Sequence, residues 1–329
     1  HGAAGAECGA VDARAARQRI LRVDRGGQQL VLRALDLLGR DAAVEQLLHL
    51  GRHRLFDLLA AFGPPDKVGT VSTLPGSFKG FGRNADELKV MRRNLLACAE
   101  HLARLRDRTG THLRLALEPE PIGHAENTPE ALRLFEQLRA EEPAQGLVDA
   151  HLGIAYDTCH FALQYEEAHE AIARLNAGGA PVLKFHLSSA LKLKPTEVAL
   201  ARLAKMHEPT YLHQTMGRAR DGSIVRFKDI PFAMAAIDQL RALEELRVHF
   251  HVPVNADRLS DELSTTNDHL KAALDVIAKA PGACRELEIE TYTWEVLPPE
   301  VRAADVADMI AEEYRWTLAE LAQRGMKPL

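Results

Sequence analysis

Four ionisable residues stand at or near the ends of short apolar, β-rich runs. Glu118 ends LRLALE, Asp157 ends GIAYD, His186 lies in VLKFHL and Glu290 lies in LEIET. In a parallel sheet the carboxyl ends of all strands meet at one edge, where the active sites of α/β barrels are built. We therefore expect these four side chains to lie close together.

Three carboxylates that converge repel one another unless a cation lies among them. Carboxylate oxygens with a single histidine suit Mn²⁺, Mg²⁺ or Co²⁺, whereas more histidines would favour Zn²⁺. We predict one divalent metal ion (Mn, Mg, Co or Zn), with the ligands Glu118, Asp157, His186 and Glu290. Taken singly, an acid at a strand end often caps the next helix, and a strand histidine can be a hydrogen-bonded core residue. The recurrence on four strands favours the metal site.

Further polar residues are spaced to line the same edge and to contact a substrate. His160 follows Asp157 by three positions, so at the start of a helix the two side chains share a face. Glu120 follows Glu118 by two positions and can point to the same place. We predict His160 and Glu120 as substrate-binding residues.

Two later histidines extend this group. In RVHFHVP, His249 and His251 alternate onto one face of the expected strand, and His251 is nearer its carboxyl end. His213 lies in a long loop, YLHQTMGRARDG, that closes with an Asp-Gly turn signal. We predict that His251 binds substrate, and we include His213 as an alternative whose loop could equally place it elsewhere.

The elements that must position these residues follow a regular alternation from about Leu55 onward. Short β-rich runs alternate with longer segments of helical periodicity, which is typical of βα units around a parallel sheet. We predict strands at Val68–Leu74, His112–Leu117, Leu152–Tyr156, Val182–Leu187, Arg247–Pro253 and Arg285–Thr291. We predict helices at Ala85–Thr109, Thr128–Glu142, Glu166–Ala177, Pro195–Lys205, Pro231–Leu243, Ser264–Ala280 and Pro299–Arg324, with Thr128 as the N-cap of the second.

The fold class that this pattern favours is α/β, as a (β/α)8 TIM barrel in residues 54–329. Six βα units are visible where a closed barrel has eight, so the first two units are missing or not recognisable. Residues 1–53 differ from the rest because they are rich in Arg, Ala and Leu and contain no lysine and no Phe, Trp or Tyr. We interpret them as a helical extension, or as a truncated or out-of-frame stretch.

The composition of the chain limits the classes of molecule that we expect it to bind and the compartment in which we expect it. The formal net charge of −5 gives no basic field for nucleic acid, so we expect a small-molecule substrate instead. No apolar run reaches the length of a membrane span. The four cysteines are far apart and form no CxxC pair, which favours a reducing, cytoplasmic location. A homo-oligomer is left open.

Several motifs together resemble a known family. DTCH at 157–160, FHL at 185–187 and the late LEIET look like motifs of the xylose-isomerase-like superfamily, which includes sugar isomerases, ketose 3-epimerases and endonucleases of the endonuclease IV class. More narrowly, TVSTLPGSFKGF, LALEPEP, IAYDTCHFALQYE, FHLSSAL, HFHVPV and LEIETYTWEVLP resemble the EboE-type metabolite traffic family. This resemblance covers about residues 54–329.

The resemblance implies roles for individual residues. Epimerases of the superfamily hold one metal with Glu, Asp, His and Glu from successive strands, which matches the four predicted ligands. In those enzymes two carboxylates also act as acid and base beside the substrate carbonyl, and here they are Glu118 and Glu290. The histidine of the DxxH motif, His160, would contact the substrate.

The resemblance leaves three functions to compare. The first is a metal-dependent sugar or sugar-phosphate isomerase or epimerase, and the second is a non-catalytic barrel that binds and hands on a metabolite. The third, a phosphodiesterase of the endonuclease IV class, is disfavoured because Thr73 and Phe78 stand where zinc-binding histidines would be needed.

Overall fold

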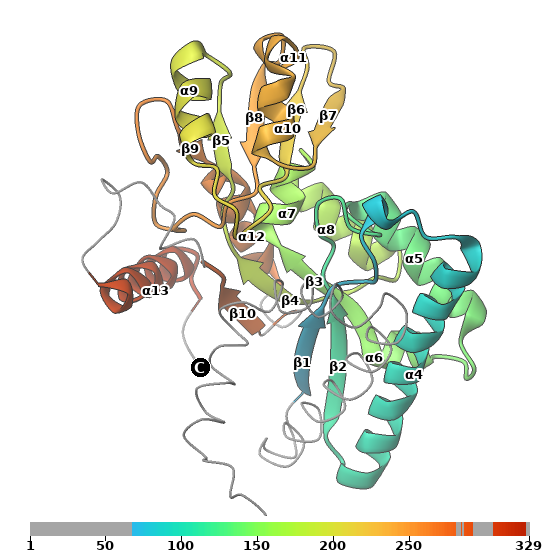
Figure 1. The fold of residues 1–329 in the computed structure, drawn as a ribbon. Helices are drawn as coiled ribbons and strands as arrows, with labels where there is room; N and C mark the ends of the chain where they lie inside the picture. The colour runs from blue at the N-terminus through green and yellow to red at the C-terminus, as the bar shows by residue number, and fades with distance from the viewer. Residues whose placement is uncertain (1–67, 281–283, 285, 292–304, 327–329) are drawn as a thin grey trace, which may run out of the picture. The chain divides into compact units, whose positions relative to one another are not determined.

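The computed structural model describes residues 68–280, 284, 286–291 and 305–326. The chain divides into two units, and all of these residues belong to the second, His49–Leu329. The predicted boundary at residue 53, and the barrel units expected before Val68, lie outside the described residues. The described residues form two sheets with helices packed on them (Figure 1).

The first sheet is parallel throughout and curls like one half of a barrel (Figure 1). In spatial order its strands are β1 (Val68–Thr73), β2 (His112–Leu117), β3 (Leu152–Asp157), β4 (Val182–Leu187) and β10 (Glu286–Ile289). Five of the six predicted strands are therefore confirmed, and the fold class is α/β. The described residues show this half-barrel and not a closed barrel. β3 is buried along its whole length, as expected for a parallel strand covered on both faces.

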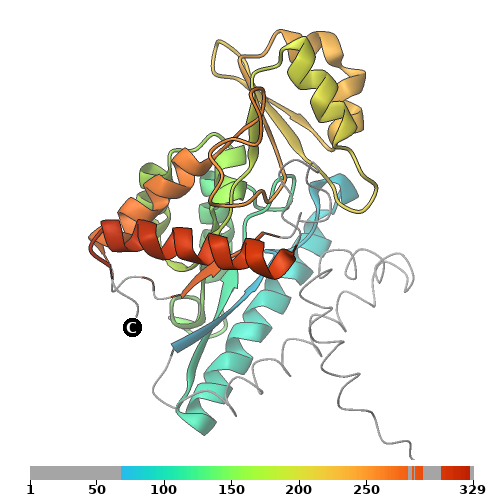
Figure 2. The same cartoon turned by 90° about the vertical axis from the view of Figure 1, so that its left-hand side faces the viewer.

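Helices follow the strands of this sheet. They are α4 (Ala85–Thr109), α5 (Thr128–Glu141), α6 (Leu147–His151), α7 (Thr158–Leu163), α8 (Ala168–Ala177), α12 (Asn267–Lys279) and α13 (Val306–Gln323), with a 3-10 turn, η1 (Lys79–Phe81), before α4. In Figure 2 the red helix α13 lies beside the orange helix α12, and the two are in contact. α4 matches its prediction at both ends because Asn84 and Glu87 form a capping box and Gly110, with φ 74°, ends the helix in the left-handed conformation.

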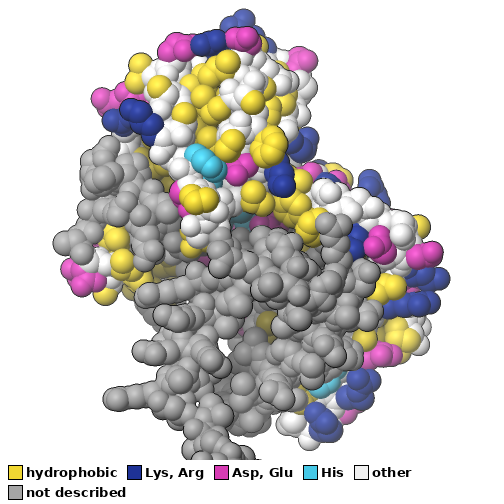
Figure 3. Space-filling model, in the orientation of Figure 1, with side chains coloured by type: hydrophobic (Ala, Val, Ile, Leu, Met, Phe, Trp, Pro, Cys, Tyr) yellow, Lys and Arg dark blue, Asp and Glu magenta, His cyan; other side chains and the backbone are white. Residues whose placement is uncertain are grey.

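The second sheet is antiparallel and is built from segments between β4 and α12. In spatial order its strands are β7 (Ile224–Phe227), β6 (Thr215–Arg218), β8 (Glu245–Val248), β5 (Leu191–Leu193) and β9 (Ser264–Thr265). Its helices are α9 (Glu197–Lys205), α10 (Ile230–Ala235) and α11 (Ile237–Arg241). On the face seen in Figure 3, hydrophobic side chains gather over this part of the molecule.

The predicted strand Arg247–Pro253 is wrong as a member of the parallel sheet. The strand formed there, β8, starts at Glu245 and pairs antiparallel with β5 and β6, because the hairpin of β6 and β7 supplies partners that the sequence pattern does not reveal. After Val248 the chain leaves that sheet and passes the end of β4, where Val252 N–H donates to Ser189 O at 2.9 Å. β10 takes the place beside β4.

Three helix predictions also differ in detail. The segment Pro231–Leu243 forms two short helices that break at Ala236, whose φ of −105° and ψ of 38° are not helical. The helix predicted from Ser264 begins at Asn267, because the two residues before the turn pair with β5 as β9. The N-cap of α5 is Asn127 and not Thr128, since the Asn127 side chain accepts from Glu130 N–H.

The hydrophobic core has a main part for each sheet. One part packs the parallel sheet against α4, α5, α8 and α12, and includes Leu115, Phe135 and Tyr156. The other packs the second sheet against α9 and α10, and includes Leu203 and Phe250. Among the described residues, no helix combines the length and the apolar character needed to cross a bilayer.

Glu313 of α13 gives the fold a measurable dependence on pH. The side chain is 1% exposed, and its Oε1 accepts hydrogen bonds from Val254 N–H at 2.8 Å and from the Thr291 hydroxyl at 2.7 Å. Burial raises the pKa of Glu313 to about 7 although both hydrogen bonds oppose it. The folded state therefore binds this proton more tightly than the unfolded state, so stability falls as pH rises from about 4.5 to about 7.

We expect Glu313→Gln to keep the Oε1 acceptor and to remove this penalty. Relative to the parent, the variant should gain about 1–3 kcal/mol in the free energy of unfolding between about pH 5 and about pH 8. Urea unfolding at both pH values measures it, with the exposed neighbour in Glu312→Gln as the control. A gain that is equal at both pH values would show that Glu313 is not protonated in the fold.

Candidate metal centre

The parallel sheet brings the four predicted ligands together at the carboxyl ends of its strands. Asp157 and His186 are direct partners in the register of β3 and β4. Glu118 follows β2 and is tied to β1 by its N–H, which donates to Thr73 O at 2.8 Å. Glu290 follows β10 and donates its N–H to Leu187 O at 3.0 Å. One ligand atom from each of the four side chains lies within 4.8 Å of the others.

His186 stands at the middle of this group. Its Nδ1 is 2.9 Å from Glu118 Oε1 and 2.8 Å from Glu290 Oε2. The same nitrogen is 3.9 Å from Asp157 Oδ2. Three carboxylates, one in β3 and one each after β2 and β10, thus face one imidazole nitrogen, as predicted from the strand ends.

The electrostatics of the group follow from burial and close charges. Burial by itself would raise the pKa of Asp157, but the charges of the surrounding histidines, led by His160, outweigh it and hold that pKa well below its usual range. Burial likewise opposes the charged form of His186, yet Glu118 and its hydrogen bond raise the His186 pKa well above the ordinary value. The carboxylates of the group are therefore held in their negative form, and they need a positively charged partner.

Asp157 serves both as a helix cap and as a free ligand. Its Oδ1 accepts from His160 N–H at 2.9 Å, which caps α7, and from the Ser188 hydroxyl at 2.7 Å. Its Oδ2 is buried and has no hydrogen-bond partner among the described residues. A buried carboxylate oxygen left without a partner is costly, so Oδ2 fits a metal ligand. The capping role and the ligand role hold at the same time, one on each oxygen.

Three histidines form a second group beside the first. Each ring turns its Nδ1 toward an oxygen that can only accept, so each Nδ1 carries a proton, and a ring that is neutral keeps its lone pair on Nε2. The three contacts are His160 Nδ1 to Pro119 O at 3.0 Å, His249 Nδ1 to Gln214 Oε1 at 2.7 Å and His251 Nδ1 to Glu290 O at 2.7 Å. The orientation of Gln214 is itself determined, because its amide donates to Pro121 O at 3.3 Å.

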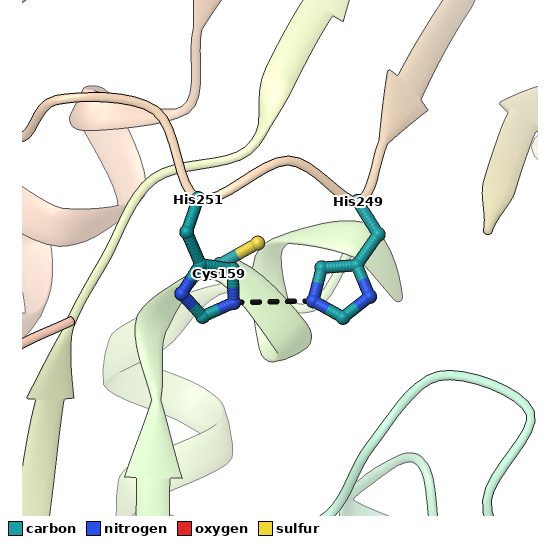
Figure 4. Close-up of side chains that lie close together, drawn as sticks. All are labelled: Cys159, His249 and His251. Atoms are coloured by element: carbon teal, nitrogen blue, oxygen red, sulfur yellow. Dashed lines mark hydrogen bonds between the residues drawn. The ribbon is translucent and has the colours of Figure 1, made fainter. Parts of the chain in front are cut away.

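The Nε2 atom of His249 lies between those of the other two histidines. His249 Nε2 is 3.1 Å from His160 Nε2 and 3.1 Å from His251 Nε2, and Figure 4 shows the His249 and His251 rings turned together beside Cys159. Lone pairs at this separation repel unless a proton or a cation lies among them. Nitrogens that share a tetrahedral zinc ion are about 3.3 Å apart, and ligating histidines commonly donate their other N–H to a carbonyl or carboxylate. Asp157, His160 and His251 each offer a ligand atom within 4.8 Å of the others, and so do Cys159, His249 and His251, so these residues could hold a zinc-class ion.

The two groups share Asp157. Its Oδ2 is 4.0 Å from His251 Nε2, close to the 3.9 Å that separates it from His186 Nδ1. Burial raises the pKa of the Cys159 thiol well above its ordinary value, so without a cation beside it the thiol is protonated. The residues can thus hold one cation among the carboxylates and a second among the histidines, whereas the sequence predicted one.

Of the other predicted residues, His160, His251 and Glu120 lie near the carboxylates and His213 does not. His160 and His251 lie at the centre, although their Nε2 atoms face a histidine rather than open space. Glu120 is 6% exposed, and burial together with the nearby carboxylates, led by Glu118, raises its pKa to about 8. The structure does not bring His213 to the carboxylates, because its ring packs on Phe250 with ring centroids 4.1 Å apart.

Sequence reasoning missed two contributors. Ser188, two positions after His186, and Gln214, directly after His213, each orient a ligand group, but neither has a distinctive sequence signal. His249, which shares a face of the chain with His251, is not among the predicted site residues either. Its HxH spacing was the available signal, since two histidines two positions apart in extended chain point the same way.

We expect the purified full-length protein to contain a tightly bound divalent metal ion. Glu290→Ala should weaken the binding of that ion at least about 10–100-fold. Loss of a group that only orients a metal ligand has an effect of this size, and loss of a direct ligand should cost no less. Elemental analysis after dialysis, followed by chelator competition, measures this. Glu136→Ala, an exposed carboxylate on α5, is the matched control. A parent protein without stoichiometric metal would refute the centre.

The sequence comparisons for this chain cover protein-family models and curated proteins. No protein-family model matches it, and no curated protein matches it significantly. The assignment of function therefore rests on the geometry of the carboxylate and histidine groups.

Proposed function

We propose that the chain is a divalent-metal-dependent enzyme that moves a proton at the carbon beside the carbonyl of a sugar or sugar phosphate, as isomerases and epimerases do. The observation that carries the proposal is the pair of carboxylates, Glu118 and Glu290, at 2.9 Å and 2.8 Å from one nitrogen of His186. Two carboxylates on either side of one cation position provide both an acid and a base.

The proposed metal ligands are Glu118, Asp157, His186 and Glu290, with Mn²⁺, Mg²⁺ or Co²⁺ as the ion that this donor set favours. When bound, such an ion polarises a substrate carbonyl and stabilises negative charge on its oxygen. It also gives the three carboxylates the positive partner that their burial demands.

The proton transfer itself falls to the two glutamates. Each has a carboxylate oxygen at the centre, so one can accept the proton from carbon while the other returns a proton to the product. Glu120, whose raised pKa of about 8 keeps it uncharged at neutral pH, can donate a hydrogen bond to a substrate hydroxyl. The buried setting limits water access, which strengthens these interactions.

The finer identity of the fold belongs to the same proposal. The curled parallel sheet, with its chemistry at the carboxyl ends of the strands, supports a xylose-isomerase-like (β/α)8 barrel, and the motifs support an EboE-type member. A cytoplasmic location is supported by Cys98, Cys159 and Cys284, which are buried free thiols.

A second candidate function has its own supporting observation. The histidines around Asp157 favour a second, zinc-like ion close to the first, because Asp157, His160 and His251 each offer a ligand atom within 4.8 Å of the others. Paired metal ions commonly hydrolyse phosphate esters. Against it, Thr73 and Phe78 provide no further histidine, and the net charge of −5 offers no field for a polyanion. A barrel that binds a metabolite without converting it is the remaining alternative.

We expect the metal-loaded protein to exchange carbon-bound hydrogen of a ketose or ketose phosphate with solvent deuterium, at the carbon beside the carbonyl. Glu118→Gln and Glu290→Gln should each slow this exchange by about 10²–10⁴-fold, the usual contribution of a general acid or base. Nuclear magnetic resonance on a panel of sugars measures it, with Glu136→Gln as the control. Sugars that bind without any exchange would replace the enzyme proposal with the binding alternative.

We expect the zinc-loaded protein to leave bis(4-nitrophenyl) phosphate intact, because the second function is the less supported one. The release of nitrophenolate, followed by absorbance, checks this. Zinc-dependent hydrolysis that disappears in His249→Asn, but not in the exposed-residue variant His169→Asn, would instead establish the hydrolytic function.

A further inference from the structure

A separate group of ionisable residues lies in the region of the second sheet. His207 and His213 belong to the segment between α9 and β6, and they are six positions apart. Asp229 stands just before α10, and one ligand atom from each of the three lies within 4.8 Å of the others. A pair of histidines at this spacing is typical of zinc-binding segments.

His213 is the unusual member of this group. Its side chain is 1% exposed, one face of its ring packs on Phe250, and neither ring nitrogen has a hydrogen-bond partner among the described residues. A buried polar group left without a partner costs about 1–3 kcal/mol, and such groups are rare in folded proteins. We therefore expect a bound atom or ion to lie in front of Nδ1 and to interact with it.

The atoms around that space have the separations of ligands that share an ion. Asp229 Oδ1 is 3.7 Å from His213 Nδ1 and 4.0 Å from His207 Nδ1. These distances are too long for hydrogen bonds. They are about 0.2–0.7 Å longer than the spacing of about 3.3–3.5 Å between two atoms that each lie about 2.0–2.2 Å from one tetrahedral zinc ion, so a small inward movement of the side chains would complete the site.

A carboxylate lies on the other side of the His213 ring. His213 Nε2 faces Glu208 Oε1 at 3.7 Å, and Glu208 is held in place by Thr210 N–H and Tyr211 N–H at 2.6 Å and 2.7 Å. The contact is too long for a hydrogen bond, but the negative charge of Glu208 favours the tautomer with its proton on Nε2, and a carboxylate on this side of a ligating imidazole strengthens the ring as a donor. Nδ1 is then the nitrogen left for the metal.

We propose that His207, His213 and Asp229 form a structural binding site for a zinc-class divalent ion, outside the carboxylate centre, with Glu208 as the positioning residue behind His213. Two imidazoles and one carboxylate suit Zn²⁺ better than Mg²⁺ or Ca²⁺. His207 is 38% exposed, so water can reach the fourth position.

This site connects to the centre through the chain. Gln214 follows His213 directly, and its Oε1 accepts the Nδ1 proton of His249. Phe250, on which the His213 ring packs, lies between His249 and His251 in the sequence. An ion that ties His213 to Asp229 would therefore hold Gln214 and Phe250 in place, and with them the histidines at the centre.

The test is zinc binding by the full chain, measured by elemental analysis and by competition with a chromophoric chelator. We expect His207→Ala to bind one equivalent fewer at a given free zinc concentration, with an affinity at that site reduced at least about 10–100-fold. Glu208→Gln should weaken the same site without removing it. His207 is partly exposed, so its loss should not unfold the protein, and His169→Ala is the matched surface control.

A second variant distinguishes zinc binding at the carboxylate centre from zinc binding at the site of His207, His213 and Asp229. Glu290→Ala should leave the equivalent that depends on His207 in place, and the double variant should lack both. Equal zinc stoichiometry and affinity in His207→Ala and His169→Ala would overturn the proposal, whatever the behaviour of Glu290→Ala.

Discussion

The contact between His186 and its carboxylates is the interaction on which the centre depends. Glu118 and Glu290 lie within hydrogen-bonding distance of one nitrogen, and Asp157 lies just behind them in a fully buried position. Charges of one sign cannot be buried together without a partner of the other sign. A proton on His186 supplies one positive charge, and a divalent ion would supply two to the same oxygens. The fold thus brings together, around His186, carboxylates that could hold a cation.

The backbone maintains that position by extending hydrogen-bonded pairing past the ends of the strands. Glu118 N–H reaches back to Thr73, and Glu290 N–H reaches back to Leu187, so both glutamates are held by a neighbouring strand although neither belongs to one. Asp157 is held from the other side as the cap of α7. Ligands on rigid elements keep their geometry better than ligands on free loops, which suits a site where small displacements matter.

The histidine group shows how outer contacts determine what a side chain can do. Neutral imidazoles can serve as donors or acceptors on either nitrogen, and the choice here is made by oxygens outside the group, including Gln214 Oε1. Burial and the neighbouring imidazoles lower the pKa of His249 well below its ordinary value, so its Nε2 remains a lone-pair donor at neutral pH. The carboxylates and the histidines therefore differ in the metal they favour, while Asp157 lies within reach of both.

The sequence by itself determined the parallel strands and the four residues at their ends, because strand periodicity and the position of Glu118, Asp157, His186 and Glu290 are local properties. It could not assign Arg247–Pro253 correctly, since whether that segment joins the parallel sheet depends on the hairpin of β6 and β7, a partner distant in sequence. Only the tertiary structure decided that His249 joins His160 and His251 and that His213 packs on Phe250 with Asp229 nearby. The direction of a side chain in a loop is set by the surface it packs on, and that surface exists only once the chain has folded.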